Sequence, residues 1–172
     1  MVLKEPTPPA TPARPGLKIA IGLLVAFAAL RVGGLDLLFD PIGWWLCLLG
    51  VGDLKPGSKA GWLALGMAVL SVVALFEGDA AQGTSYSAFW LGYAAGALVT
   101  LWAVVDVAIR YIRPSGDHYD VTLLDALRWA VVGAGAVALL AESGYAWLGE
   151  VAVIAMYCAL ALLVVILWRL RA

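Results

Sequence analysis

Charged side chains are scarce in this chain. Asp, Glu, Lys and Arg make up 13% of the residues, about half of the roughly 25% that is typical of soluble domains. Hydrophobic residues make up 63% of the chain, and its mean hydropathy is +0.94. This composition excludes an ordinary soluble globular domain and predicts a lipid bilayer as the surrounding medium. The formal net charge of −1 gives no indication of a nucleic-acid partner.

Residue types that usually carry catalysis or bind metals are nearly absent. The chain has one histidine, His118, and two cysteines, Cys47 and Cys158, and it contains no H-E-x-x-H, C-x-x-C, G-x-S-x-G or P-loop motif. His118 beside Asp117 and Asp120 is interpreted as a solvated loop residue rather than a metal ligand. Both cysteines are interpreted as buried thiols, since a disulfide would require their helices to pack at matching depth. We therefore predict no enzyme activity, no metal site and no cofactor.

The length of the chain limits the architecture. At about 20 residues per span, 172 residues hold about six spans with short loops and leave no room for a soluble catalytic domain. The fold class predicted is therefore all-α, a polytopic membrane bundle of about six transmembrane helices. The expected spans are 17–32, 41–54, 60–76, 88–112, 123–141 and 151–168. The proline-rich segment 1–16 is expected to be a disordered cytoplasmic tail rather than a removable signal peptide.

Basic residues fall at alternate ends of the apolar stretches, and this pattern predicts the orientation. Excess Lys and Arg marks the cytoplasmic side of a membrane protein, so both termini are expected to lie in the cytoplasm and the protein in the plasma (inner) membrane. Only Arg31 falls on the other side. The residues predicted to lie on the cytoplasmic side are Lys4, Arg14, Lys18, Lys55, Lys59, Arg110, Arg113, Arg128, Arg169 and Arg171. The acids predicted for the outer connections are Asp36, Asp40, Glu77, Asp79, Glu142 and Glu150.

Two local signals predict where helices begin. Asp40 and Pro41 have the residue types preferred as N-cap and first helical residue, so the second span is expected to begin there. That span is short, at roughly 21 Å against a hydrocarbon core of about 30 Å, and a re-entrant hairpin is the alternative; the charge pattern favours a crossing. Thr122 and Asp125 have the spacing of a capping box, which predicts that the fifth span begins near Leu123 after a loop over 113–121.

Asp106 is the acid that lies well inside a predicted span. Intramembrane acids are candidates for ion or proton handling because burying a carboxylate in lipid is costly. Arg110 follows four residues later, which is the favourable spacing for a helical ion pair. Asp106 and Arg110 are therefore interpreted either as a structural ion pair, which we favour, or as a proton or cation site.

Small residues mark two faces on which helices can approach closely. Gly92 and Gly96 form a G-x-x-x-G pair on the stripe that also carries Asp106, and Gly133 and Gly135 lie in the fifth span. Such residues let neighbouring helix backbones come near one another. We predict these four glycines to be helix-packing positions, within the chain or against another copy or partner.

The segment 39–54, with the sequence FDPIGWWLCLLGVGDL, resembles a recurring segment of small uncharacterised bacterial multi-span membrane proteins. Those proteins carry an acid and a proline, then Ile-Gly-aromatic, then a Leu-rich stretch that ends at a glycine. Here the order is Asp-Pro instead of Pro-Asp, and Trp44 replaces a frequent tyrosine. The resemblance implies a bacterial inner-membrane protein and implies no catalytic activity.

The sequence thus favours an accessory or scaffold subunit of a membrane assembly, whose partners are the bilayer and either another copy or another membrane protein. The alternative is a small transporter or an ion or proton channel that uses Asp106. A segment matching Asp40–Trp44 does not recur in the second half of the chain, so an inverted three-plus-three repeat, as in many transporters, is only a geometric possibility.

Overall fold

A computed structural model of the protein describes residues 14–27, 31–32, 35–36, 40–77, 88–115, 118–141 and 146–169. These residues form an all-α fold, as the composition predicts, with one short pair of strands. The helices are α1 (Pro15–Phe27), α2 (Asp40–Leu54), α3 (Lys59–Glu77), α4 (Ala88–Ile112), the 3-10 turn η2 (Arg113–Ser115), α5 (His118–Ala141) and α6 (Ala146–Arg169). The strands β1 (Arg31–Val32) and β2 (Leu35–Asp36) pair antiparallel, with Arg31 opposite Asp36.

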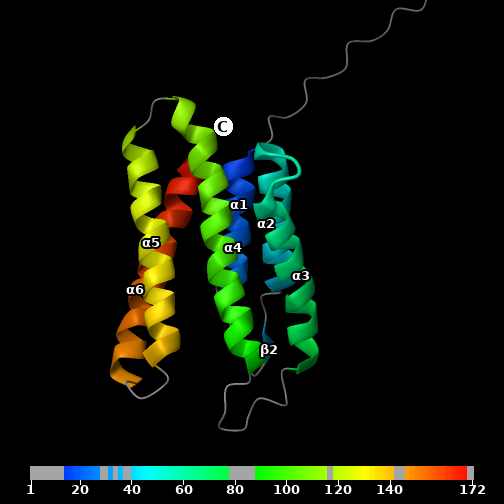
Figure 1. Ribbon diagram of the computed structural model, residues 1–172, viewed down its shortest axis with the longest axis vertical. Helices are drawn as coiled ribbons and strands as arrows, with labels where there is room; N and C mark the ends of the chain where they lie inside the picture. Colours follow the sequence, from blue (N-terminus) through cyan, green and yellow to red (C-terminus); the bar gives the residue numbers. More distant parts are fainter. Residues whose placement is uncertain are drawn as a thin grey trace, which may run out of the picture.

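The six α-helices lie side by side as an up-and-down bundle (Figure 1). Each helix packs against the next one along the chain, and α1 also packs against α6, which closes the bundle. α4 has a central place because it contacts α1 and α2 in addition to α3 and α5. In the view of Figure 1, α3 and α5 lie on opposite sides of α4.

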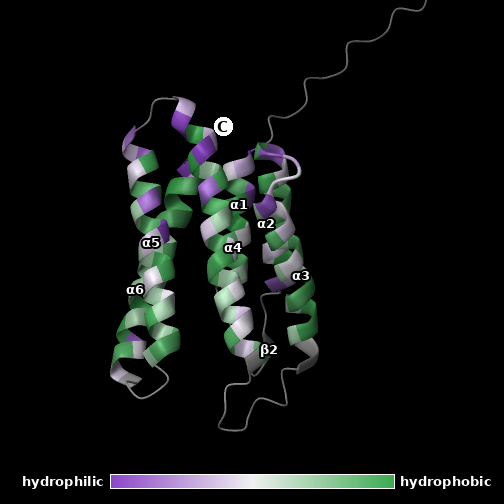
Figure 2. Cartoon of the chain, viewed as in Figure 1, coloured by the Kyte–Doolittle hydropathy of each residue, from purple (hydrophilic) through white to green (hydrophobic). Residues whose placement is uncertain are grey.

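The two ends of the bundle differ in charge. α1 and α3 begin, and α2, α4 and α6 end, at one end, which we call the basic end. Hydrophilic residues gather there, whereas hydrophobic residues cover most of the remaining helix length (Figure 2). The lysines and arginines whose side chains the structure describes all lie in the half of the bundle nearest the basic end: Arg14, Lys18, Lys55, Lys59, Arg110, Arg113, Arg128 and Arg169.

Three described helical segments are long and apolar enough to cross a membrane: Phe89–Ile112, His118–Ala141 and Trp147–Arg169. Two further apolar segments, Pro15–Phe27 and Lys59–Ala74, are shorter. Of the six predicted spans, only those that correspond to α4, α5 and α6 are therefore long enough to cross a membrane in the described chain. The 13 residues of α1 and the 15 of α2 correspond to roughly 20–22 Å of helix, less than the hydrocarbon thickness of about 30 Å.

Several predicted boundaries were wrong. α1 begins at Pro15, inside the predicted tail, and ends at Phe27 rather than residue 32, where Arg31 and Val32 form β1. Proline is favoured in the first helical turn, and the Gly33-Gly34 dipeptide between the strands favours a hairpin. The predicted disorder of the tail concerns residues 1–13, which lie outside the described part of the chain.

The fifth helix also begins earlier than predicted, at His118 instead of near Leu123. The Thr122 hydroxyl donates a hydrogen bond of 2.8 Å to the His118 carbonyl, four residues back along the helix. Threonine makes this bond inside helices, so Thr122 and Asp125 are not a capping box and His118 is not in a loop. α6 likewise begins at Ala146, five residues before the predicted Val151.

The core of the described bundle is aliphatic. All six helices contribute to it, and most of its members are branched or long apolar side chains that fill the space between helices without hydrogen-bonding needs. Among the fully buried side chains are Ile19, Leu23, Val51, Leu101, Val104, Val105, Leu124, Val131, Leu163 and Leu167. The surface is also apolar, with large exposed side chains such as Leu140, Ile154 and Leu162, as expected for helices in contact with lipid rather than water.

Candidate functional site

The main polar cluster lies between α4 and α5 near the basic end. Asp106 on α4 is at its centre, with its side chain 18% exposed. Its Oδ2 forms an ion pair with Nε of Arg110 at 2.8 Å, and its Oδ1 accepts a hydrogen bond of 2.8 Å from Nη1 of Arg128 on α5. Nη2 of Arg128 also pairs with Oδ1 of Asp125. Arg128 therefore joins an acid on each helix, and its side chain is only 11% exposed.

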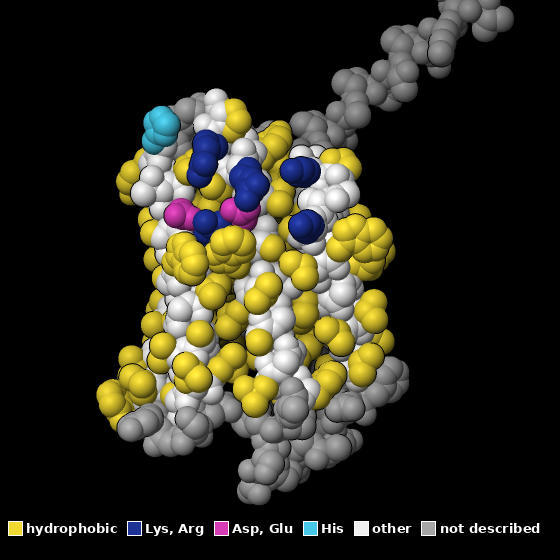
Figure 3. Space-filling view, in the orientation of Figure 1, with side chains coloured by type: hydrophobic (Ala, Val, Ile, Leu, Met, Phe, Trp, Pro, Cys, Tyr) yellow, Lys and Arg dark blue, Asp and Glu magenta, His cyan; other side chains and the backbone are white. Residues whose placement is uncertain are grey.

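Two tryptophans complete this cluster. The Arg128 guanidinium lies over the indole of Trp102, 4.6 Å from the ring centroid, a distance at which cation–π attraction is significant. Trp102 in turn meets Trp129 of α5 edge to face, with ring centroids 6.1 Å apart. We call these residues the α4–α5 charged cluster: Trp102, Asp106, Arg110, Asp125, Arg128 and Trp129. Figure 3 shows basic and acidic side chains together near this end, with large hydrophobic side chains directly beneath them.

The geometry of Asp106 favours the structural interpretation of the residue. Each of its carboxylate oxygens pairs with a different arginine. Two guanidinium groups stabilise the ionised carboxylate and, because they are positive, oppose the approach of a cation. The sequence identified Asp106 and Arg110 as a pair. It did not identify Asp125, Trp102 or Trp129 as parts of the same cluster.

The four predicted packing glycines occupy two kinds of position. A Cβ placed on Gly135 would lie 2.7 Å from Cδ2 of Leu98, and one on Gly96 would lie 3.1 Å from Sδ of Met67, so both glycines are at helix contacts. A Cβ on Gly92 or Gly133 would meet no described atom within 4 Å. Gly92 and Gly133 therefore pack against no other described helix, and both lie on open helix faces.

The closest helix contact of the described bundle was missed by the sequence analysis. α1 and α2 meet at Gly22, Gly43 and Gly50, where an added Cβ would lie within 3 Å of atoms of the other helix. At Gly43 the nearest of these is the backbone nitrogen of Ala26, at 2.5 Å. Gly43-x-x-x-Cys47-x-x-Gly50 places small residues on one face of α2. This signal was present in the sequence, inside the segment 39–54.

A second polar group links three helices at the end of the bundle opposite the basic end. Tyr93 on α4 donates a hydrogen bond of 2.9 Å to Oδ2 of Asp40, and its hydroxyl lies 2.8 Å from Oγ of Ser71 on α3. Ser71 is buried and lies 2.7 Å from the carbonyl oxygen of Met67. α2 begins at Asp40-Pro41, as predicted, and the Asp40 carboxylate also holds α2 to α4. Tyr93 and Ser71 were not predicted, because single polar residues inside apolar runs carry no distinctive spacing.

The other predicted candidates lie apart from these groups. Lys18 and Asp53 form an ion pair of 2.6 Å between α1 and α2. Cys47 is buried, but Cys158 is free and exposed on α6, so the prediction of two buried thiols holds for only one of them. In the part of the chain that the structure describes, no group of three or more His, Cys, Asp or Glu residues is arranged to hold a metal ion.

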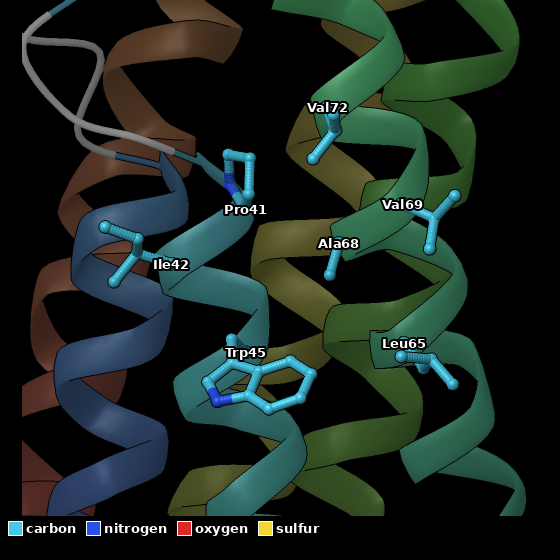
Figure 4. Close-up of a pocket in the computed structure, with 7 residues that line it drawn as sticks. All are labelled: Pro41, Ile42, Trp45, Leu65, Ala68, Val69 and Val72. Atoms are coloured by element: carbon cyan, nitrogen blue, oxygen red, sulfur yellow. The ribbon is translucent and has the colours of Figure 1, made fainter.

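An apolar groove of about 370 Å³ lies between α2 and α3, on the surface of the bundle. The close-up in Figure 4 shows the lining residues: Pro41 and Trp45 of α2 lie beside α3, whereas the Ile42 side chain points away from it. The α3 residues are Leu65, Ala68, Val69 and Val72. The groove offers no charged group or hydrogen-bonding side chain apart from the Trp45 indole, so it is suited to hydrocarbon and not to a polar substrate.

The chain matches no protein-family model. No curated protein and no solved structure is significantly similar to it. The function must therefore be argued from the residues themselves, and the resemblance of the segment 39–54 to bacterial multi-span proteins stays a prediction.

Proposed function

We propose that this protein is a multi-pass protein of the bacterial plasma membrane and that it acts as an accessory or scaffold subunit of a membrane assembly. In this proposal all six α-helices cross the bilayer, with both termini and the basic end in the cytoplasm. The location of the described lysines and arginines in one half of the bundle supports this orientation. Local thinning or tilting of the bilayer would accommodate the short helices α1 and α2.

The observation that carries the subunit role is the packed aliphatic core. The two polar groups of the described bundle, the α4–α5 charged cluster and the Asp40–Tyr93–Ser71 group, lie toward opposite ends. Between them, Ala97, Leu98 and Leu101 of α4 are buried. A transporter needs polar groups or water along its path, and the buried hydroxyl of this layer, that of Thr100, is already hydrogen-bonded to the Gly96 carbonyl of its own helix. A protein with a filled interior acts through its outer surface.

The open glycines supply a surface of the kind that a partner helix uses. Gly92 on α4 and Gly133 on α5 have no described neighbour within 4 Å of an added Cβ. Exposed small residues let a second helix approach closely in lipid, where packing rather than the hydrophobic effect drives association. We propose that these faces contact another copy of the chain or a different membrane protein.

Purification from native membranes in mild detergent, followed by mass measurement of the intact complex, tests this function. The expected result is a stoichiometric complex that Gly92→Ile or Gly133→Ile dissociates. Gly66→Ile is the matched control, because Gly66 on α3 is also an open glycine with no described neighbour. A monomer in the wild type, or an equal effect of all three substitutions, would contradict the proposal.

The second candidate, a proton or ion pathway, is favoured by the position of Asp106 within the longest helix. Proton flux in proteoliposomes that carry a pH-sensitive dye distinguishes the two candidates. The subunit proposal predicts that wild type and Asp106→Asn give the same flux as empty vesicles. A wild-type flux that Asp106→Asn abolishes, with the variant still folded and inserted, would instead establish the transport function.

A further inference from the structure

The α4–α5 charged cluster continues beyond Arg110 toward the basic end, where the chain carries Arg113. Trp102, Asp106 and Arg110 fall within about 80° of one another around the helix axis, at about 100° per residue, so they share the face of α4 that looks toward α5, and Arg113 follows directly in η2. Asp125, Arg128 and Trp129 lie on the facing side of α5. Together these seven residues form a strip, which we call the arginine–tryptophan strip.

The charges of the strip do not cancel. Asp106 and Asp125 offset two of its arginines, and Arg113 is exposed and has no ion-pair partner in the described part of the chain. Arg110 contacts Asp106 through Nε, and its side chain is 69% exposed. The outer part of the strip is therefore cationic, with Arg110 and Arg113 three residues apart in the sequence.

The inner part of the strip is apolar and aromatic. Trp129 is 57% exposed and lies beside Trp102, which is about two helical turns farther into the bundle than Arg110 and about three farther than Arg113. In a bilayer, indole rings lie at the border between headgroups and acyl chains. The strip thus has a cationic part at headgroup depth and an aromatic part at the depth where acyl chains begin. These two parts match the anionic headgroup and the acyl chain of a single amphipathic molecule.

We propose that the arginine–tryptophan strip binds an anionic phospholipid of the inner leaflet. The phosphodiester is held by the guanidinium groups of Arg110 and Arg113, and the upper acyl chain lies against Trp129. Arginine binds phosphate oxygens through paired N–H donors, and basic sites between helices at the cytoplasmic side are suited to anionic headgroups. The inference rests on the proposed orientation, in which the basic end faces the cytoplasm.

Titration of the delipidated full-length protein with phosphatidylglycerol or phosphatidylcholine of identical acyl chains, followed by native mass spectrometry, tests the proposal. The expected dissociation constant for phosphatidylglycerol is at least about tenfold lower than for phosphatidylcholine. Arg113→Gln should weaken phosphatidylglycerol binding about fivefold, the contribution expected of one basic residue near an anionic lipid. Arg113 makes no described ion pair, so this variant should fold normally; Arg110→Gln should act in the same direction.

Lys59→Gln is the matched control, because it removes one exposed positive charge at the same end of the bundle but on α3, on the far side of α4 (Figure 1). The dissociation constant of Lys59→Gln for phosphatidylglycerol should stay within about twofold of the wild-type value. Equal affinity for both lipids, or an equal loss in Lys59→Gln and Arg113→Gln, would overturn the proposal. Comparable binding of inorganic phosphate would also overturn it, since the ligand would then be a soluble anion. Cysteine labelling tests the orientation separately. If labelling places the basic end in the cytoplasm and any of these binding results is found, only the lipid-binding proposal fails.

Discussion

At the scale of single residues, the stability of this protein depends on which polar side chains inside the bundle are paired. A charge within a membrane span is costly unless it is paired. Arg128 has two carboxylate partners and the face of Trp102, whereas Arg110 has one carboxylate partner and is mostly exposed. Two arginines bound to the same aspartate should therefore differ strongly in their contribution to stability.

Arg128→Gln should lower the free energy of unfolding by about 2 kcal/mol or more, because it leaves Asp106 and Asp125 without the guanidinium that joins them. Arg110→Gln should cost less than about 1 kcal/mol, as expected of an exposed pair. Thermal or denaturant unfolding of the purified variants in one detergent measures both. Similar losses in the two variants would show that burial does not determine the contribution of these arginines.

The glycines of the α1–α2 contact give a second prediction at this scale. Gly43→Ala would place a Cβ 2.5 Å from the backbone nitrogen of Ala26, and backbone atoms cannot move aside without separating the helices. We expect a loss of about 1–3 kcal/mol of stability, as for other overpacked sites. Gly92→Ala, which meets no described atom, should change stability by less than about 1 kcal/mol. Unfolding midpoints of the two variants provide the comparison, and an unaffected Gly43→Ala protein would contradict the close contact.

At the scale of elements, helix bounds follow the apolar pattern where charged residues or loop residues flank it closely. The predicted span 88–112 coincides with α4, and the predicted span 41–54 differs from α2 by one residue. The start of α5 was placed too late because its first turn is polar: His118, Tyr119 and Asp120 extend the helix beyond the apolar stretch. A hydropathy pattern detects the part of a helix suited to lipid and not the polar turns that continue it.

Tyr93 joins three elements through one hydroxyl group, which makes it a test of how α2, α3 and α4 are held together. Tyr93→Phe removes the hydrogen bond to Asp40 and the contact with Ser71 while it keeps the ring. The expected loss is about 1–3 kcal/mol, since a partly buried carboxylate loses a donor. Tyr111→Phe on the same helix is the control, because Tyr111 is half exposed, and it should unfold like the wild type. Equal unfolding midpoints for all three proteins would show that the hydroxyl group contributes no stability.

At the scale of the whole molecule, the up-and-down arrangement makes a prediction about sidedness. In a background with Cys158→Ser, which removes the exposed thiol, single cysteines report which ends face the cell exterior. A membrane-impermeant maleimide should label Ser85→Cys, between α3 and α4, in intact cells. It should label Lys59→Cys, at the basic end, only after the membrane is permeabilised. The reverse pattern would contradict the proposed orientation, and labelling of both sites in intact cells would contradict a membrane crossing by α3.

The fold class and the separation of charge along the helix axes follow from the order of residues alone. Both depend on local composition: apolar stretches form helices in lipid because each helix satisfies its own backbone hydrogen bonds, and basic residues cluster at one end of each. Asp106 and Arg110 could be paired for the same reason, since their spacing along one helix fixes their distance. The tertiary structure decided which faces of the helices meet. It brought Arg128, Asp125 and Trp102 to Asp106, joined Tyr93 to Asp40 and Ser71, and placed Gly43 against α1 while leaving Gly92 open. These contacts depend on the rotation and depth of one helix relative to another, which side-chain packing sets and which the order of residues along a single helix does not encode.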